Sequence, residues 1–508
     1  MTDLAMQVLV LSPEKRQLLE ILLAEEGSTW DAFPLSFAQQ RLWFMEQLQP
    51  NTPWYNVPAA VWMTGTLHAR ALEQSLNEIV NRHETLRTTF AMVEGQPVQC
   101  IAPRLTLPLP VMNLEALTAS EREVEVQQRA REEAQRPFNL AQGPVLRAIL
   151  LCLGDDEYVF LLTMHHIISD GWSLGVFMQE LATLYAAYTS GKPSPLPSLP
   201  IQYADFAVWQ REWLRGDVLE TQLTYWKEQL SGLLPVLELP TDRRRPAMQS
   251  FHDAKHSIVL VKSLTAALTA LCRQQGVTLF MTLLTAFKVL LQRYTGQDDI
   301  CIGSPIANRN RQETEGLIGF FVNTLVSRTD LSGNPSFRDL LARVRETCLG
   351  AYAHQDLPFE KLVKALHPER DVSRNPLFQV MFALQNTPMP TLALNGLTLR
   401  PLEIDGDVAK FDLTLNLEER ADGLHGWFEY NTELFDAATI ARMAGHFQTL
   451  LAGIVADPDT AIGQLPLLSP AERHQLLVEW NATATPYPQE RCIHDLIAAQ
   501  ATQTPEAC

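Results

Sequence analysis

The sequence predicts a mixed α/β or α+β fold in two lobes, because of its length, its apolar content and the alternation of its elements. The chain has 508 residues, whereas a single folding unit usually spans ~100–200 residues. Hydrophobic residues make up 46 % of the chain and charged residues 19 %. This composition supplies packed cores and excludes wholesale disorder. Strand-type and helix-type runs alternate in both halves, as in the α/β and α+β classes.

The first half predicts a leader and then a lobe of helices and paired strands. Helices are expected over 12–26, 70–83 and 172–189, where apolar residues recur at helical spacing. Two apolar runs over 145–166 are separated by a Gly-Asp-Asp turn and predict a hairpin. The stretch 190–200 holds four prolines and predicts a linker between the lobes.

The second half repeats the alternation. We expect helices over 278–296, 335–355 and 434–458, strands over 298–307 and 376–386, and a hairpin over 410–431. The last residues are polar and contain prolines, which is typical of a connector. We therefore divide the chain into a leader helix (1–33), a first lobe (34–195), a second lobe (196–465) and a connector (466–508).

Charge and cysteine content exclude several classes of protein. Lys and Arg number 40 and Asp and Glu 58, which gives a net charge of −18 and argues against a nucleic-acid binder. The seven cysteines are scattered, so we expect reduced thiols in a cytoplasmic protein. The N-terminus has no secretory-signal pattern, and the most apolar helical stretch is too short to span a bilayer.

The sharpest local feature is the run from His165 to Gly171, HHIISDG, where an apolar strand gives way to a helix. Histidine takes up and releases protons near neutral pH. Adjacent residues of an extended segment point to opposite faces, so at most one of the two histidines is expected to line a given cavity. Gly171 allows a tight turn into the helix.

Other interpretations of this run compete with acid–base catalysis by a histidine. A buried histidine bonded to backbone groups is the common case, and it is the favoured alternative for His165. A metal site would need more ligands than this run offers, so we expect none. A serine hydrolase, a phosphate-binding loop or a dinucleotide site would need glycine motifs that the chain lacks.

The run resembles the HHxxxDG signature of the chloramphenicol-acetyltransferase-like acyltransferases. The remaining segments narrow the resemblance to the condensation domains of nonribosomal peptide synthetases, whose motifs occur here in family order. They are SFAQQRLWFMEQLQP (36–50), YNVP (55–58), RHETLRTTF (82–90), MHHIISDGWS (164–173), YADFAVWQ (203–210), IGFFVNTLVSR (318–328), HQDLPFEKLV (354–363) and RDVSRNPLFQVMF (370–382). The resemblance covers about 34–465.

The resemblance implies two chloramphenicol-acetyltransferase-like lobes in a V-shaped pseudo-dimer with a central tunnel. One carrier-protein phosphopantetheine arm enters from each side. An acceptor amine attacks a donor acyl thioester, which forms an amide and frees a thiol. The domain itself binds no cofactor. The implied partners are a downstream peptidyl carrier protein, an adjacent adenylation domain and a donor that is an upstream carrier or coenzyme A, with no nucleic acid and no membrane. We expect a monomer.

The resemblance also assigns roles to residues. The candidate catalytic residues are His166, His165, Asp170 and Gly171, with His166 facing the tunnel centre as a base or as a group that positions the amine. Trp172, Ser173 and Asn323 are candidates for the tunnel wall, with core packing as the alternative for Trp172 and Asn323. Asp170 is expected to form a structural salt bridge, first with Arg87 and second with Arg309.

The sequence leaves the donor type open. Only about 33 residues precede the first motif and none resembles a carrier domain, so a starter domain that N-acylates an amino acid from acyl-CoA is favoured over elongation from an L-peptidyl carrier. Ester formation and a silent recruitment platform are further alternatives. The tail resembles the linker and first turns of a truncated adenylation domain, so we expect little ordered structure after about 490.

Overall fold

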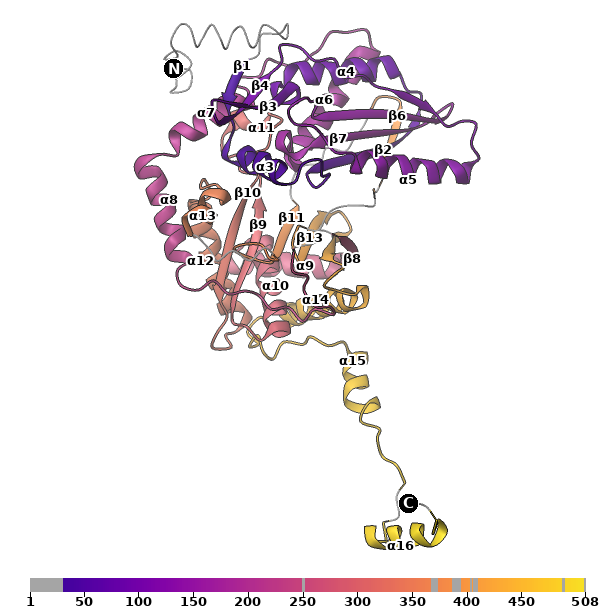
Figure 1. Cartoon of the computed structure of the whole chain (residues 1–508). Coiled ribbons are helices and arrows are strands. Elements are labelled where there is room, and N and C mark those ends of the chain that lie inside the picture. The colour runs from indigo at the N-terminus through magenta and orange to yellow at the C-terminus, as the bar shows by residue number, and fades with distance from the viewer. Residues whose placement is uncertain are drawn as a thin grey trace.

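The computed structural model describes residues 31–248, 252–366, 373–385, 394–402, 404, 410–486 and 489–506. The leader helix expected over 12–26 and Cys508 lie outside these residues. The described chain forms two lobes, one above the other in Figure 1, with a tail at the C-terminal end. Strands and helices are mixed in both lobes, so the predicted fold class is confirmed.

The first lobe is built on a five-stranded sheet in the order β12-β2-β7-β6-β5. Its strands are β2 (Asn56–Gly65), β5 (Val111–Asn113), β6 (Leu146–Gly154), β7 (Glu157–His165) and β12 (Leu397–Pro401). β6 and β7 form the predicted hairpin, with Leu146 opposite Met164. β7 is almost continuously buried because helices cover both faces of the sheet.

Amphipathic helices cover this sheet. They are α4 (Ala69–Arg82) and α6 (Gly171–Thr189) on one side and α5 (Ala119–Gln135) on the other. The expected apolar spacing of α4 is confirmed, since Leu72, Leu76 and Ile79 are fully buried. A small sheet of β1 (Asp31–Pro34), β4 (Gln96–Ile101) and β3 (Thr88–Val93) lies beside helix α3 (Phe37–Leu48), and a 3-10 turn, η1 (Glu84–Arg87), precedes β3.

The second lobe contains a six-stranded sheet in the order β10-β9-β11-β13-β14-β8. The strands are β8 (Asp253–Val261), β9 (Asp299–Ile306), β10 (Asn323–Asp330), β11 (Val380–Gln385), β13 (Leu413–Arg420) and β14 (Gly423–Asn431). Only β11 pairs in parallel with its described neighbours. Its helices are α8 (Gly216–Gln229), α9 (Lys262–Gln275), α10 (Leu279–Thr295), α11 (Gln312–Glu315), α12 (Phe337–Ala353), α13 (Phe359–Leu366) and α14 (Ala437–Ala456).

The chain passes between the lobes more than once. β12, the orange strand among the purple ones in Figure 1, pairs with β2 of the first lobe. α7 (Tyr203–Trp213) packs through Tyr203 and Phe206 on Leu317 and Phe321. A cut at residue 196 therefore assigns β12 to the wrong lobe. A five-residue strand joins a sheet through its backbone, so its sequence does not reveal which sheet it joins.

The C-terminal tail is more ordered than predicted. α15 (Pro470–His474) and the π-helical turn η3 (Gln475–Glu479) are followed by α16 (Ile493–Gln503), so the expectation of little order after about 490 is wrong. α16 buries no side chain. Within the described ranges, no single helix has the length and apolarity to cross a bilayer. α9 and α10 meet that test only as a pair, and the pair is bent by 105°.

Candidate active site

His165 is held by its surroundings at the end of β7. Its ring is 2 % exposed and lies between the rings of Tyr55 and Phe138, with centroids 6.3 and 6.1 Å away. Its Nδ1 accepts the Ile167 N–H at 3.1 Å. Burial lowers its pKa to about 3. His165 is thus a buried histidine bonded to the backbone, which is the alternative that the sequence favoured for it. This geometry argues against a catalytic role for His165.

His166 begins the 3-10 turn η2 (His166–Ile168) and is only partly buried. Its Nδ1 lies 2.6 Å from the carbonyl oxygen of Ser169. A carbonyl oxygen only accepts, so Nδ1 carries the hydrogen and Nε2 keeps a lone pair. Burial, and then the positive charge of Lys410, lower the His166 pKa to about 4. His166 is therefore neutral at pH 7 and presents an acceptor at Nε2.

Asp170 joins the two lobes. As N-cap of α6, its Oδ1 accepts the Ser173 N–H at 2.8 Å, and its Oδ2 accepts the Phe321 N–H at 3.0 Å. Arg309, from the loop after β9, donates to Oδ1 at 3.2 Å. Asp170 and Arg309 are both buried. These bonds fix the start of α6 directly after the histidines, which is a structural role.

The expected salt bridge thus comes from Arg309, and the first-choice partner, Arg87, is wrong. Arg87 pairs with Glu84 at 3.4 Å and donates to the Ala102 carbonyl. It lies at the end of η1 beside the small sheet. Sequence spacing could not distinguish the two arginines, because both are remote from Asp170 along the chain.

Two of the three candidate tunnel-wall residues, Ser173 and Asn323, form hydrogen bonds to other groups of the protein. The Ser173 hydroxyl accepts from Arg309 and from the Gly319 N–H, at 2.7 and 3.0 Å. The amide of Asn323 bonds Gln355, Leu357, Thr324 and Phe359. Both side chains are buried, which agrees with the core-packing alternative for Asn323, and a substrate-binding role for either residue stays a prediction. The polar character of the Ser173 hydroxyl and the Asn323 amide did not reveal that their hydrogen bonds are made within the protein.

Trp172 and Gly171 are more open. The Trp172 indole is partly exposed, donates to the Glu315 carbonyl at 2.9 Å and lines a cavity. Gly171 is exposed, and a Cβ there would have no neighbour within 4 Å. A side chain larger than hydrogen therefore fits at Gly171 without a clash at its Cβ.

Comparison with known proteins assigns the family. The family model described as "Condensation domain" matches residues 30–477. The chain belongs to the condensation-domain family. It is 54 % identical over 475 residues to one polypeptide of the linear gramicidin synthase of Brevibacillus parabrevis, a match that covers 93 % of this chain and 6 % of that protein. Phosphinothricin tripeptide synthetase PhsC of Streptomyces viridochromogenes is 41 % identical over 528 residues, 100 % of this chain and 48 % of its own length.

Solved structures agree with this family. The X-domain from teicoplanin biosynthesis is 29 % identical, has a TM-score of 0.78 and covers 86 % of this chain and 97 % of its own. The four-domain nonribosomal peptide synthetase AB3403 has a TM-score of 0.83 at 24 % identity over 94 % of this chain and 37 % of its own, which shows the fold. The chain spans less than half the length of the two curated relatives named above. Condensation domains are amide-bond-forming acyltransferases.

Three further residues contribute to this condensation-domain site, and of these only Lys410 lies outside the motifs that the sequence singled out. The Phe320 ring lies 4.6 Å from that of His166. The Gln39 amide donates to the Ile167 carbonyl at 3.2 Å and so supports η2 from α3. Lys410 lies with its Nζ 5.1 Å from the Tyr55 ring, and burial lowers its pKa to about 8. The position of Lys410 shortly before the apolar strand β13 is the one sequence feature that could have indicated this residue.

Proposed function

We propose that this chain forms an amide bond between a donor acyl thioester and the amine of an aminoacyl acceptor on a carrier protein. The observation that carries the proposal is His166, a neutral imidazole whose hydrogen is fixed on Nδ1, so that Nε2 is an acceptor. The substrates would be presented on phosphopantetheine arms, and the protein would need no cofactor of its own.

The chemistry follows from this acceptor. An α-amine has a pKa of ~7.7–8, so part of it is neutral at pH 7. Its nitrogen attacks the thioester carbon, the C–N bond forms, and the tetrahedral adduct expels the thiolate as the C–S bond breaks. The nitrogen loses one proton and the thiolate gains one. Nε2 of His166 would accept the amine N–H and orient the nitrogen lone pair toward the carbonyl carbon.

Positioning is favoured over strong base catalysis for His166. A base with a pKa of about 4 takes a proton from a cationic adduct less readily than an ordinary histidine. Orientation alone supplies as much acceleration as general base catalysis, which gives ~10²–10⁴-fold. Asp170, Arg309 and Phe320 would act on the rate only by holding η2 and α6 in place.

We propose a carrier-bound aminoacyl or peptidyl donor, and thus elongation. Segments similar to this chain occur in three different polypeptides of linear gramicidin synthase, at 53–54 % identity. A linear peptide has a single first residue, so a segment that occurs in three polypeptides does not acylate that residue in all of them. The starter interpretation, with acyl-CoA as donor, stays a prediction that the same assay tests.

The assay offers the two donors to the purified chain in parallel. The acceptor is a carrier domain loaded with an amino acid, and the donor is either an aminoacyl carrier or an acyl-CoA series. Intact-mass measurement of the acceptor reports the product. We expect dipeptidyl product with the carrier donor. Product from acyl-CoA alone would establish the starter function, and no product with either donor would contradict amide synthesis.

A recruitment platform is the second candidate. The X-domain from teicoplanin biosynthesis, which shares this fold at 29 % identity, has been solved in complex with OxyB.

For this chain, the partners we propose are the two carriers and an adenylation domain after the tail. Exposed apolar side chains of the tail offer a contact surface to the adenylation domain. They are Leu477, Trp480, Ile493 and Ile497.

A further inference from the structure

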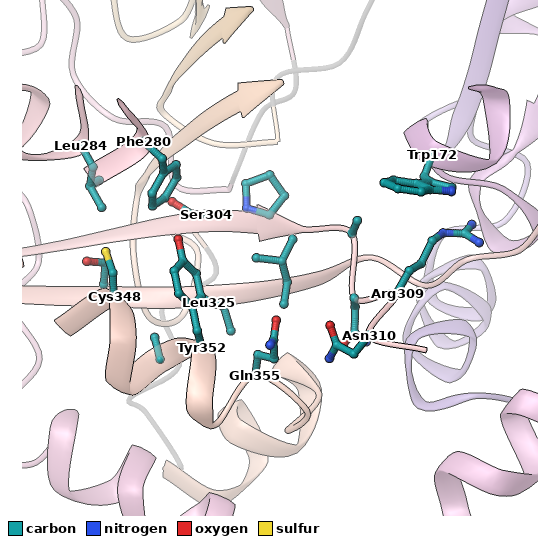
Figure 2. Close-up of a pocket in the computed structure, with 16 residues that line it drawn as sticks. Trp172, Phe280, Leu284, Ser304, Arg309, Asn310, Leu325, Cys348, Tyr352 and Gln355 are labelled. Carbon is teal, nitrogen blue, oxygen red and sulfur yellow. The ribbon is translucent and has the colours of Figure 1, made fainter. Parts of the chain in front are cut away.

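A cavity of about 330 Å³ opens beside Trp172 and runs into the second lobe. Figure 2 shows Trp172 and Arg309 at one end and Phe280, Leu284 and Cys348 at the other. The Trp172 end is fixed by the bond from its indole to Glu315 and by the Arg309 guanidinium, whose centre lies 5.8 Å from the Trp172 ring. This end therefore adjoins the HHIISDG segment.

The inner walls come from regular elements. Ser304 of β9 and Leu325 of β10 are direct cross-strand neighbours. Cys348, Ala351 and Tyr352 recur at the spacing of one face of α12. Walls that belong to a sheet and a packed helix hold their shape, which is what a side-chain pocket requires.

The lining is uncharged in its depth. Arg309 is the one charged group among the described lining residues, and it is already bonded to Asp170. Burial raises the pKa of the Cys348 thiol to about 11, so this group is neutral as well. The buried ammonium of Lys288 lies behind this wall but already donates to the Ile300 and Ser327 carbonyls and to the Thr329 hydroxyl. A carboxylate or an ammonium at the inner end would therefore lose its hydration without gaining a free partner of opposite charge.

Two hydroxyls in this wall lack partners. Ser304 and Ser327 are 4 % and 6 % exposed, and within the described ranges neither hydroxyl oxygen has a hydrogen-bond partner. Buried hydroxyls are usually bonded, so these two have hydrogen-bonding capacity that the described protein groups do not use. The cavity thus combines apolar surface with unused hydrogen-bonding capacity.

We propose that this cavity, the Ser304–Ser327 pocket, receives the side chain of a thioester-bound substrate and selects large, uncharged side chains that carry a polar atom, such as tyrosyl or tryptophanyl. Benzene fits an engineered cavity of ~150 Å³, so 330 Å³ accommodates a bicyclic or substituted ring. The inference rests on the proposed amide synthesis. The side chain belongs to the donor or to the acceptor, and the experiment distinguishes the two.

The test compares substrates in two arms. One arm varies the acceptor residue from glycyl to leucyl, phenylalanyl, tyrosyl and tryptophanyl with a fixed donor, and the other varies the donor with a fixed acceptor. In one arm, we expect kcat/KM to be at least ~10-fold higher for the large residues than for glycyl, because a single methylene in an apolar pocket is worth ~10–200-fold. A flat profile in both arms would overturn the inference. No turnover with any pair would overturn the proposed function instead.

Variants tie the preference to the pocket. Ala351→Phe fills it and should lower kcat/KM for tyrosyl and tryptophanyl much more than for glycyl, which removes most of the advantage of large residues. Ala438→Phe, at an exposed position of α14, is the matched control and should keep the preference. Equal losses for glycyl and tyrosyl in Ala351→Phe would contradict the assignment.

Serine variants give a second measurement if Ala351→Phe does not fold. Ser304→Ala and Ser327→Ala remove unbonded hydroxyls, so the melting temperature should hold or rise. The preference for tyrosyl over phenylalanyl should fall by several-fold. An unchanged ratio in both variants would show that the hydroxyls do not contact the substrate.

Discussion

The Nδ1 of His166 lies 2.6 Å from the carbonyl oxygen of Ser169, three residues further along the chain. This bond spans η2 and is made inside the HHIISDG segment itself. It fixes both the ring orientation and the tautomer. The Asp170–Arg309 ion pair holds the next residue from the other lobe, so both lobes determine where Nε2 lies.

The pH dependence of the rate should follow the amine and not His166. Because burial and Lys410 lower the His166 pKa to about 4, its protonation state hardly changes between pH 5.5 and 8. The single-turnover rate should therefore rise with pH through ~7.7–8, the pKa of an α-amine. A step near pH 6.5 that disappears in a His166→Gln variant would contradict this. Lys410→Met serves as the control, since Lys410 also titrates at about 8.

Acid should destabilise the fold through the same histidines. The folded pKa values are about 3 for His165 and about 4 for His166, whereas an unfolded histidine has a pKa of ~6.5. Between the folded and the unfolded pKa, the unfolded chain binds more protons than the folded one. The contribution of the two histidines to the free energy of unfolding is fully present above pH ~6.5. It falls as the pH drops toward 4, by roughly 3 kcal/mol for His166 alone. Urea unfolding at pH 7 and pH 5 measures this loss. An equal free energy of unfolding at both pH values would contradict it.

Asp170→Ala should destabilise the protein severely. The change leaves the Arg309 charge buried without its carboxylate and removes the N-cap of α6, and breaking a buried pair from one side costs ~3–5 kcal/mol. Urea unfolding or soluble yield measures the effect. Arg309→Met should cost more than Arg87→Met, which breaks only the bond to Glu84 and a carbonyl contact. A stable, well-folded but inactive Asp170→Ala protein would point to a catalytic carboxylate.

Gly171→Leu separates stability from turnover. A Cβ at this position meets no atom within 4 Å, and replacing glycine in a compatible conformation stabilises by ~0.4–1 kcal/mol, so the melting temperature should not fall. The larger side chain would occupy open space at the end of the HHIISDG segment and should slow carrier-dependent condensation by at least ~10²-fold, the size of a lost positioning effect. Gly171→Ala is the control. Full activity of Gly171→Leu would place the substrate path elsewhere.

Local patterns predicted the elements and the position of the site. Apolar spacing located α4, α6 and the β6–β7 hairpin, because periodicity depends on neighbouring residues. The distinction between Arg309 and Arg87 lies outside any local pattern, since it depends on how the loop after β9 reaches α6. The same holds for β12, for Lys410 and for the saturated hydrogen bonds of Ser173 and Asn323. Tertiary packing decides each of these.

The most direct test of His166 compares His166→Ala with the wild-type chain, using two acceptors and one carrier-bound donor. If Nε2 positions the amine, the variant should lose ~10²-fold or more with the carrier-bound amino acid. It should keep a near-normal rate with a small, reactive free amine at high concentration. Intact-mass analysis and product chromatography follow the two reactions. Equal losses with both amines would contradict positioning, and no loss with the carrier-bound acceptor would contradict amide synthesis at His166 altogether.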